Sequence, residues 1–234
     1  MKKYLKIGIV CFLSVLSIRA SDQPNIVIIL SDDHSVNAIS SYESKLVETP
    51  NIDRLASQGM KFNNVFCVNS ICGPSRASIL TGLYPQTHGQ VDNYHHFPKN
   101  KATYPELMAQ SGYSVALFGK THMDESVNAL KSMDQYMISH GAEYHNPQFK
   151  TKGQKGKKKH PGYVTDILTD KAIAWLKQGD DSKPRLLMVH HPAPHMPFQG
   201  KESLKSLFKD VVFPEPASFN DPEKNKPNSP RPDN

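Results

Sequence analysis

The chain is organised around the stretch Ser70-Ile71-Cys72-Gly73-Pro74-Ser75-Arg76-Ala77-Ser78-Ile79-Leu80-Thr81-Gly82. Proline favours the first position of a helix, so Pro74 predicts a helix start, and Gly82 fits the C-terminal end of that helix. Cys72 would then lie at the helix N-terminus, where free backbone N–H groups and the helix dipole favour an anion. Arg76 adds a positive charge about one turn further on. These residues are typical of a reactive centre, although a buried structural cysteine beside a helix start fits them equally well.

The composition allows a folded core. The chain has 234 residues, of which 38% are hydrophobic, enough for one domain or for part of a larger one. The formal net charge is +6, and much of it comes from one local run of lysines, so it says little about the rest of the surface. Apart from Cys11, near the start of the chain, the cysteines are Cys67 and Cys72, too few for a disulfide framework. A bridge between these two would block the chemistry expected at Cys72.

The first 20 residues have the pattern of a secretory signal peptide. Lysines at positions 2, 3 and 6 form a basic start, residues 7–16 form a short apolar core, and Ala20 is a plausible cleavage residue. The apolar run is well short of the ~20 residues needed to span a bilayer. We therefore expect no stable membrane span, and export to a periplasm or to the outside of the cell.

Two adjacent carboxylates follow the first expected strand. Residues 25–30, NIVIIL, form a continuous apolar and β-branched run, typical of a buried parallel strand. Asp32 and Asp33 come directly after it, and ligands of open α/β sheets bind beyond the carboxyl ends of strands. Adjacent carboxylates repel each other unless a cation holds them, and a hard divalent cation prefers such oxygens. The alternative is an acid pair in a turn or at a helix N-cap.

Two further strand ends carry candidate site residues. Residues 114–118 predict a strand that is followed by Lys120 and His122, which an extended segment would direct into one pocket. Residues 185–189 predict another strand, followed by a proline-rich loop with His191 and His195. The alternatives are a solvated lysine with an incidental histidine, and surface histidines in a proline-rich turn.

Helices are expected at residues 49–59, 103–112 and 163–178. Thr49 is the expected cap of the first helix, and Thr103 and Glu106 have the spacing of a capping box at the start of the second. The segment 150–160, KTKGQKGKKKH, is basic and contains glycine, so it predicts a mobile loop. It could attract a sulfated polyanion. Nucleic acid is not expected, because no aromatic residues alternate with the lysines.

The complete motif from Cys72 to Gly82 resembles the signature of the type I sulfatases. In that family the cysteine is oxidised to formylglycine by a maturation enzyme, so the resemblance implies that Cys72 is the precursor of the nucleophile. The element Gly119-Lys120-Thr121-His122 resembles a second family element, although Thr121 stands where an aromatic residue is usual. Ala-Pro-His-Met-Pro at residues 193–197 resembles a third.

The resemblance assigns roles to the candidate residues. It implies that Asp32, Asp33 and the modified Cys72 bind Ca²⁺. It also implies that Lys120 and His195 contact the sulfate group and that His122 contacts the formylglycine. Arg76 completes the expected catalytic set, and His191 is a weaker candidate on the substrate side.

The implied fold is an α/β, alkaline-phosphatase-like sulfatase fold with a mixed, mostly parallel sheet flanked by helices. In the implied mechanism the aldehyde is hydrated to a gem-diol. One hydroxyl of that gem-diol, bound to calcium, attacks sulfur, and the other then expels sulfate. A phosphatase or phosphodiesterase on the same scaffold is the competing enzyme, but its nucleophile is usually Ser or Thr. A non-catalytic glycan-binding remnant is the competing class.

The expected substrate is a sulfated glycan. Segments around Asp32, residues 69–71, residues 144–147 and residues 190–195 resemble bacterial sulfatases of N-acetylglucosamine-6-sulfate. An arylsulfatase or another sugar sulfatase is the alternative. The expected division is a signal peptide at 1–20, the N-terminal part of a sulfatase catalytic domain at 21–217 and an irregular tail at 218–234. Because Ca²⁺ takes ~6–8 oxygen ligands, we expect this chain to be an incomplete and inactive fragment.

Overall fold

The computed structural model describes residues 23–97, 99–122, 128–179, 182–215, 217 and 219–220. The expected signal peptide, and nearly all of the expected tail, lie outside the described residues. The chain divides into two units. Unit 1 combines Met1–His34 with Asn64–Phe198, and unit 2 combines Ser35–Asn63 with Gln199–Asn234. In the described parts of the chain no helix is long and apolar enough to cross a membrane.

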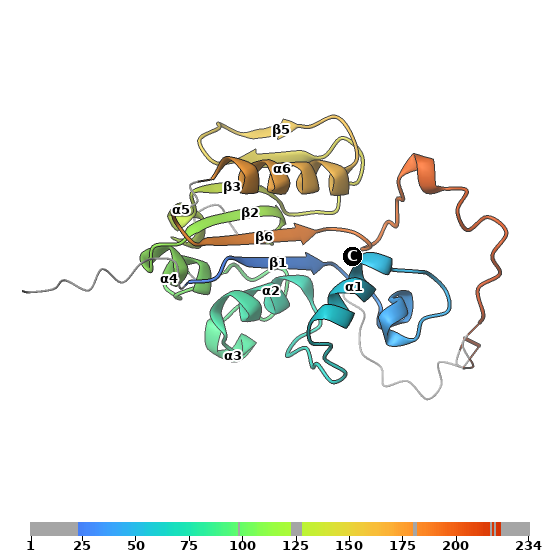
Figure 1. The fold of residues 1–234 in the computed structure, drawn as a ribbon. Helices are drawn as coiled ribbons and strands as arrows, with labels where there is room; N and C mark the ends of the chain where they lie inside the picture. The colour runs from blue at the N-terminus through green and yellow to red at the C-terminus, as the bar shows by residue number, and fades with distance from the viewer. Residues whose placement is uncertain are drawn as a thin grey trace, which may run out of the picture. The chain divides into compact units, whose positions relative to one another are not determined.

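Unit 1 is built on a sheet that has six strands within the described residues, in the order β1-β6-β2-β3-β4-β5 (Figure 1). Strands β1, β6, β2 and β3 pair in parallel, and β4 and β5 are added antiparallel. The sheet is therefore mixed and mostly parallel, as the sequence predicts. The strand bounds are β1 Ile26–Ser31, β2 Ser114–Lys120, β3 Gln135–Ser139, β4 Gln148–Thr151, β5 Lys157–Lys159 and β6 Arg185–His191.

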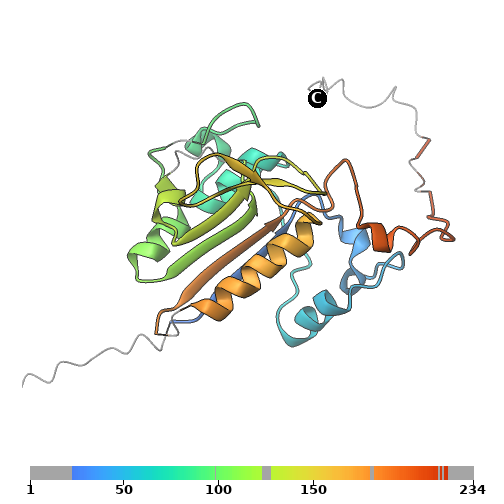
Figure 2. The ribbon, with the colours of Figure 1, turned by 90° about the horizontal axis from the view of Figure 1, so that it is seen from above.

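The central strands β2 and β6 are buried because helices cover both faces of the sheet. On one face, Val115, Leu117 and Met188 pack in a core with residues of α2, α4 and α5. On the other face, Phe118 and Leu187 pack against α6, which runs along β6 in Figure 2. The continuous apolar runs of both strands follow from this double coverage. The helices of unit 1 are α2 Cys72–Thr81, α3 Pro85–His88, α4 Tyr104–Gln110, α5 Asn128–Ser132 and α6 Val164–Gln178.

Strand β1 differs from the expected strand because it is buried on one face only. Ile26 and Ile28 pack against the core with α2, whereas Val27 and Ile29 are 51% and 65% exposed. Strand β1 pairs with β6 and is the first strand in the sheet order. The prediction of a strand is confirmed, and the prediction that all its residues are buried is wrong.

The structure corrects four other local predictions. His191 belongs to β6 and not to the loop beyond it, because β6 continues to pair with β1 as far as this residue. The segment 150–160, expected to be a loop, forms part of the β4–β5 hairpin. Pro74 is the third residue of α2 and not the first. Thr103 precedes α4, but its side chain makes no capping hydrogen bond, so the capping box is wrong.

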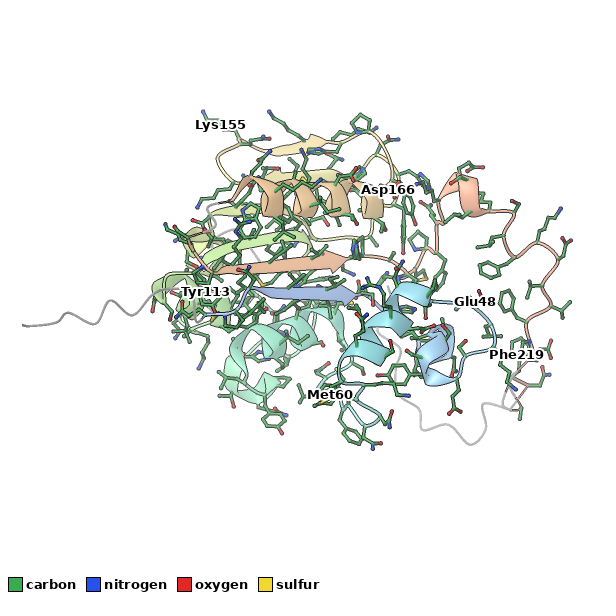
Figure 3. The ribbon with its side chains drawn as sticks, in the orientation of Figure 1. Glu48, Met60, Tyr113, Lys155, Asp166 and Phe219 are labelled. Carbon is green, nitrogen blue, oxygen red and sulfur yellow. The ribbon has the colours of Figure 1, made fainter. Side chains whose placement is uncertain are left out.

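Unit 2 contains α1 Pro50–Gln58 and three short 3₁₀ helices, at Val36–Ala38, Ser40–Tyr42 and Glu202–Leu204, within its described residues. The helix at 49–59 is confirmed in its position. Thr49 precedes it without a side-chain cap, and its Oγ1 instead donates to Asp53 at 3.1 Å. Ser40 Oγ donates to the same carboxylate at 2.6 Å. Glu48 and Met60, which Figure 3 labels, lie shortly before and shortly after α1 in the sequence.

Candidate functional site

Helix α2 places Cys72 at its first residue, at the edge of the sheet where the parallel strands end. The helix start is fixed by Gly73, whose N–H donates to Asn93 Oδ1 at 2.8 Å. A Cβ on Gly73 would lie 2.6 Å from Gln90 Nε2, so a larger residue here would require the Gln90 side chain to shift. At the other end Gly82 takes the left-handed conformation, φ 69°, that ends helices.

Asp32 lies between two cations. It is 5% exposed, Lys120 Nζ donates to its Oδ2, and Arg76 lies 3.4 Å from its Oδ1. Burial acts to raise the pKa of Asp32, but the hydrogen bond from Lys120 and the charges of Arg76 and Lys120 outweigh it and leave the pKa lowered. Asp32 is therefore a carboxylate at neutral pH, and it joins the end of β1 to the end of β2.

Arg76 connects α2 to the two central strands. It is 4% exposed, its NH1 donates to the carbonyl of Lys120 at 2.7 Å, and NH1 lies 3.4 Å from His190 Nδ1. A guanidinium can only donate, so the neutral imidazole of His190 is the acceptor. Burial, and then the charge of Arg76, lower the pKa of His190 to about 3, which keeps that imidazole neutral.

Cys72, Asp32 and His195 together form a candidate ligand cluster. One ligand atom from each lies within 4.8 Å of the others, and His195 Nε2 lies 3.6 Å from Asp33 Oδ2. Lys120 Nζ lies 3.8 Å from Cys72 Sγ. Burial raises the pKa of the Cys72 thiol, with Lys120 opposing. The unmodified side chain is thus a neutral thiol and not a thiolate nucleophile at neutral pH.

The expected calcium ligands, Asp32, Asp33 and Cys72, fit a hard cation only in part. The carboxylate oxygens of Asp32 and Asp33 are the ligands that Ca²⁺ prefers, whereas a thiol is not. An oxygen at position 72, as in formylglycine, would convert the third member into a suitable donor. The residues therefore fit calcium better after modification of Cys72 than before it.

Two of the histidines expected in the site have a buried ring nitrogen with no hydrogen-bond partner among the described residues. They are His122 Nε2 and His191 Nδ1. Burial, and then the charges of Lys120 and Arg76, lower the pKa of His122 to about 4, and burial lowers the pKa of His191. Both imidazoles are neutral at neutral pH. A buried polar atom without a partner is costly, so both nitrogens are available to a ligand.

The backbone at the strand ends is unusual in two places. Asp33 and His122 have φ angles of 59° and 53°, in the left-handed region that residues other than glycine rarely adopt. Such conformations concentrate at functional sites because the surrounding structure must impose them. Here they occur directly after β1 and β2, where they turn the chain away from the sheet.

Tyr144 is a site residue whose structural role the sequence analysis missed. Its hydroxyl donates to the carbonyl of His195 and lies 3.5 Å from the carbonyl of Pro192. Burial, and then nearby Tyr163, Asp32 and Asp33, raise its pKa to about 12, so it remains a donor. No local pattern indicates this role, because the partner lies 51 residues away in the sequence.

A cavity of about 640 Å³ opens beside Cys72. Its lining comes from the end of β1, from α2 and from the segment before α2. The lining residues are Leu30, Ser31, Asp32, Asp33, His34, Val65, Cys67, Ser70, Ile71, Cys72, Ser75, Arg76 and Ile79.

Most of the residues expected in the site therefore lie together. Direct contacts join Asp32, Cys72, Arg76 and Lys120, and His195 is joined to Asp33. His122 is near enough for the charges of Lys120 and Arg76 to affect its pKa. His191 makes no hydrogen bond to these residues among the described contacts. Two other residues were not expected: His190, which contacts Arg76, and Asn93, which contacts the start of α2.

The fold and the site define an α/β protein that holds carboxylates, cations and a helix-terminal cysteine at the carboxyl ends of parallel strands. A family model described as Sulfatase matches residues 24–214. The chain belongs to the sulfatase family.

Two relatives cover most of the chain. It is 38% identical over 203 residues to the N-acetylglucosamine-6-O-sulfatase of Bacteroides thetaiotaomicron, a match that covers 85% of this chain and 36% of the relative. It is 30% identical over 215 residues to the ulvan-active sulfatase of Formosa agariphila, covering 85% of this chain and 40% of the relative. The chain thus spans well under half the length of these relatives.

Solved structures have the same fold. The structure of BT4656 in complex with its substrate D-glucosamine-2-N,6-O-disulfate matches with a TM-score of 0.79 and 38% identity, over 84% of this chain and 40% of that one. The structure of Ps i-CgsB matches with a TM-score of 0.73 and 26% identity, over 81% of this chain and 49% of that one. The alkaline-phosphatase-like sulfatase fold expected from the sequence is confirmed.

Proposed function

We propose that this chain is part of a sulfuric ester hydrolase that removes sulfate from a sulfated glycan of the N-acetylglucosamine-6-sulfate type. The observation that carries the proposal is Cys72 at the start of α2, facing Asp32 and within 3.8 Å of Lys120 Nζ. The names of the first relative and of the substrate bound to BT4656 support a sulfated glucosamine. The basic and apolar start of the chain supports action in a periplasm or outside the cell.

The cations of the site suit a sulfate ester. A sulfuryl group carries negative charge, and more develops on the departing oxygen as the S–O bond breaks, so fixed positive groups favour the reaction. Lys120 and Arg76 are held at the site by Asp32 and by the carbonyl of residue 120. In the proposed role both cations donate to sulfuryl oxygens, together with His195 from the loop after β6.

The neutral histidines suit substrate contact. The pKa of His122, lowered to about 4, keeps its imidazole neutral, and its Nε2 has no hydrogen-bond partner among the described residues, so it can hydrogen-bond a ligand at neutral pH. His191, at the end of β6, is available to hydroxyl groups of the sugar. Formylglycine at position 72 would supply the attacking oxygen, and Ca²⁺ held by Asp32 and Asp33 would supply positive charge beside the sulfuryl group.

The proposal is tested by mass spectrometry and by turnover. In protein made together with a formylglycine-generating enzyme, the peptide containing residue 72 should be about 18 Da lighter than its thiol form. The peptide containing Cys67 is an internal control and should keep its thiol mass. Where turnover is measurable, Cys72→Ala should abolish it, and turnover retained by that variant contradicts the assignment.

The sugar position is tested with a panel of glucosamines carrying 6-O-, 3-O-, 2-O- or N-sulfate. We expect preference for the 6-O-sulfate, and preference for the 2-O- or N-sulfate would refute this choice. Phosphate monoesters belong in the same panel, because faster hydrolysis of phosphate would favour a phosphatase. A chain that binds sulfated glycan while residue 72 remains an unmodified thiol after co-expression with the maturation enzyme would favour a binding protein.

We also propose that the residues described in this chain do not complete a calcium shell. Asp32, Asp33 and residue 72 offer fewer donors than the ~6–8 oxygen ligands that Ca²⁺ takes. Water can fill some positions but brings no negative charge. Calcium titration of the 234-residue protein should therefore show weak binding, and robust calcium-dependent turnover by that protein would overturn this part of the proposal.

A further inference from the structure

The β4–β5 hairpin, residues 148–160, is the most highly charged element of the protein. It contains six lysines and no acidic residue. The whole chain has 28 basic and 22 acidic residues, so outside this hairpin the two signs are equal in number. The net charge of the protein is therefore concentrated in one element.

The hairpin is an ordered part of the sheet. Phe149 on β4 is 0% exposed in the core beneath α6, and β4 pairs with β3 at two positions. Strand β5 pairs with β4 along its whole length and has no buried residue. The lysines are thus presented on a fixed backbone, where successive side chains on one face lie about 7 Å apart.

The strand register places like charges opposite one another. Lys150 is paired directly with Lys157, and Lys159 follows on the same face, whereas Lys158 lies opposite Phe149 on the face toward α6. Lys157 and Lys159 are exposed on β5 and lie on the same face, and such a regular spacing of ammonium groups matches a regular row of anionic groups.

One end of the hairpin lies at the same edge of the sheet as the candidate site. Strand β5 runs in the same direction as β3, because each is antiparallel to β4, so its carboxyl end points to the edge of the sheet where the site lies. There His160 N–H donates to the carbonyl of Pro147 at 2.9 Å. Just before β4 in the chain, Tyr144 holds the His195 loop. Lys155, labelled in Figure 3, lies at the other end, at the hairpin tip.

We propose that the β4–β5 hairpin binds an extended sulfated polysaccharide, so that the polymer is held beside the site while one sugar is processed. This rests on the proposed function, which supplies a sulfated glycan as substrate. Phe149 is the only Phe, Tyr or Trp of the hairpin and is buried, and the His160 ring packs edge-on against it, so the hairpin offers no exposed Phe, Tyr or Trp ring on which a nucleic-acid base could stack. The hairpin also exposes no large apolar side chain that would insert into a membrane.

The test is binding to heparin, a highly sulfated polysaccharide, with the complete 234-residue chain. The hairpin variant is Lys155→Gln, Lys157→Gln and Lys159→Gln. We expect its affinity to fall on the order of tenfold at about 0.1 M salt, with a weaker dependence on salt, because fewer counterions are exchanged. A charge-matched control changes three exposed lysines of unit 2, Lys45→Gln, Lys205→Gln and Lys209→Gln, and should bind heparin almost as the parent does.

A second variant with arginine at the three hairpin positions keeps the charge and should keep the affinity. The proposal is overturned if the hairpin and control variants lose affinity equally, which indicates only a net-charge effect. It is also overturned if neither changes, which leaves the lysines as protection of an exposed sheet edge. Equal, hairpin-dependent binding of duplex DNA or of phosphatidylserine vesicles would assign the surface to another partner.

Heparin binding needs no turnover, so the two proposals fail separately. If the residue-72 peptide keeps its thiol mass after co-expression with a formylglycine-generating enzyme while hairpin-dependent binding is intact, only the proposed function is contradicted. If residue 72 is converted but binding does not depend on the hairpin, only this inference is contradicted.

Discussion

Replacement of Asp32 should strongly destabilise unit 1. Asp32 is the carboxylate between Lys120 and Arg76, whose side chains are 2% and 4% exposed. Asp32→Asn leaves two buried cations without their counter-charge, and loss of one partner of a buried pair costs about 3–5 kcal/mol. Domains are stable by only ~5–15 kcal/mol, so the effect is a large part of the total.

The assay is urea unfolding in the presence of a chelator, which removes any contribution of a metal. With an m-value of about 2 kcal/mol/M, the midpoint for Asp32→Asn should fall by roughly 1.5–2.5 M. The matched control is Asp33→Asn. The Asp33 side chain is 57% exposed and its contact with His195 is 3.6 Å, so its change should stay below about 1 kcal/mol.

The parent and Asp32→Asn also test how the stability of unit 1 depends on pH. The pKa of Asp32 is lowered in the folded state, so its contribution to stability is present above its unfolded pKa of about 3.9 and is lost as pH falls through the folded pKa. The difference between parent and Asp32→Asn should therefore shrink at low pH. Equal falls in the urea midpoints of Asp32→Asn and Asp33→Asn would refute the reasoning. So would a stability difference between the parent and Asp32→Asn that grows as pH falls.

Three further predictions concern residues around the site. Gly119→Ala places a Cβ 1.9 Å from the carbonyl oxygen of His190, at a φ of 122°, so we expect a loss of about 3 kcal/mol or more in unfolding experiments. Gly141→Ala, where a Cβ meets nothing within 4 Å, is its control, and equal losses would contradict the steric argument. Tyr144→Phe removes the hydrogen bond to the loop after β6 and should cost about 1 kcal/mol; an unchanged urea midpoint would count against it. In unconverted protein, burial raises the pKa of Cys72, so its alkylation followed by mass spectrometry should be slow at neutral pH and still accelerate above about pH 9. A rate that levels off below that pH would show a thiolate already formed.

The sequence alone predicts the central strands and the residues that follow them. Strands β2 and β6 are continuous apolar runs because both faces of the sheet are covered there, so their local composition carries the signal. Since the carboxyl ends of parallel strands meet at one edge, Asp32, Lys120 and His195 could be placed together before any contact was known. The motif around Cys72 likewise identifies the family without the fold.

Pairing between distant segments decided the rest. The lysine-rich segment has the local composition of a loop, and it is a hairpin because β4 pairs with β3 and buries Phe149 beneath α6. His190 was not selected as a site residue because its partner, Arg76, lies 114 residues away. Val27 is exposed although its sequence reads as core, because burial depends on which helices cover each face. These outcomes depend on contacts between segments far apart in the chain, and no short stretch of sequence contains both partners.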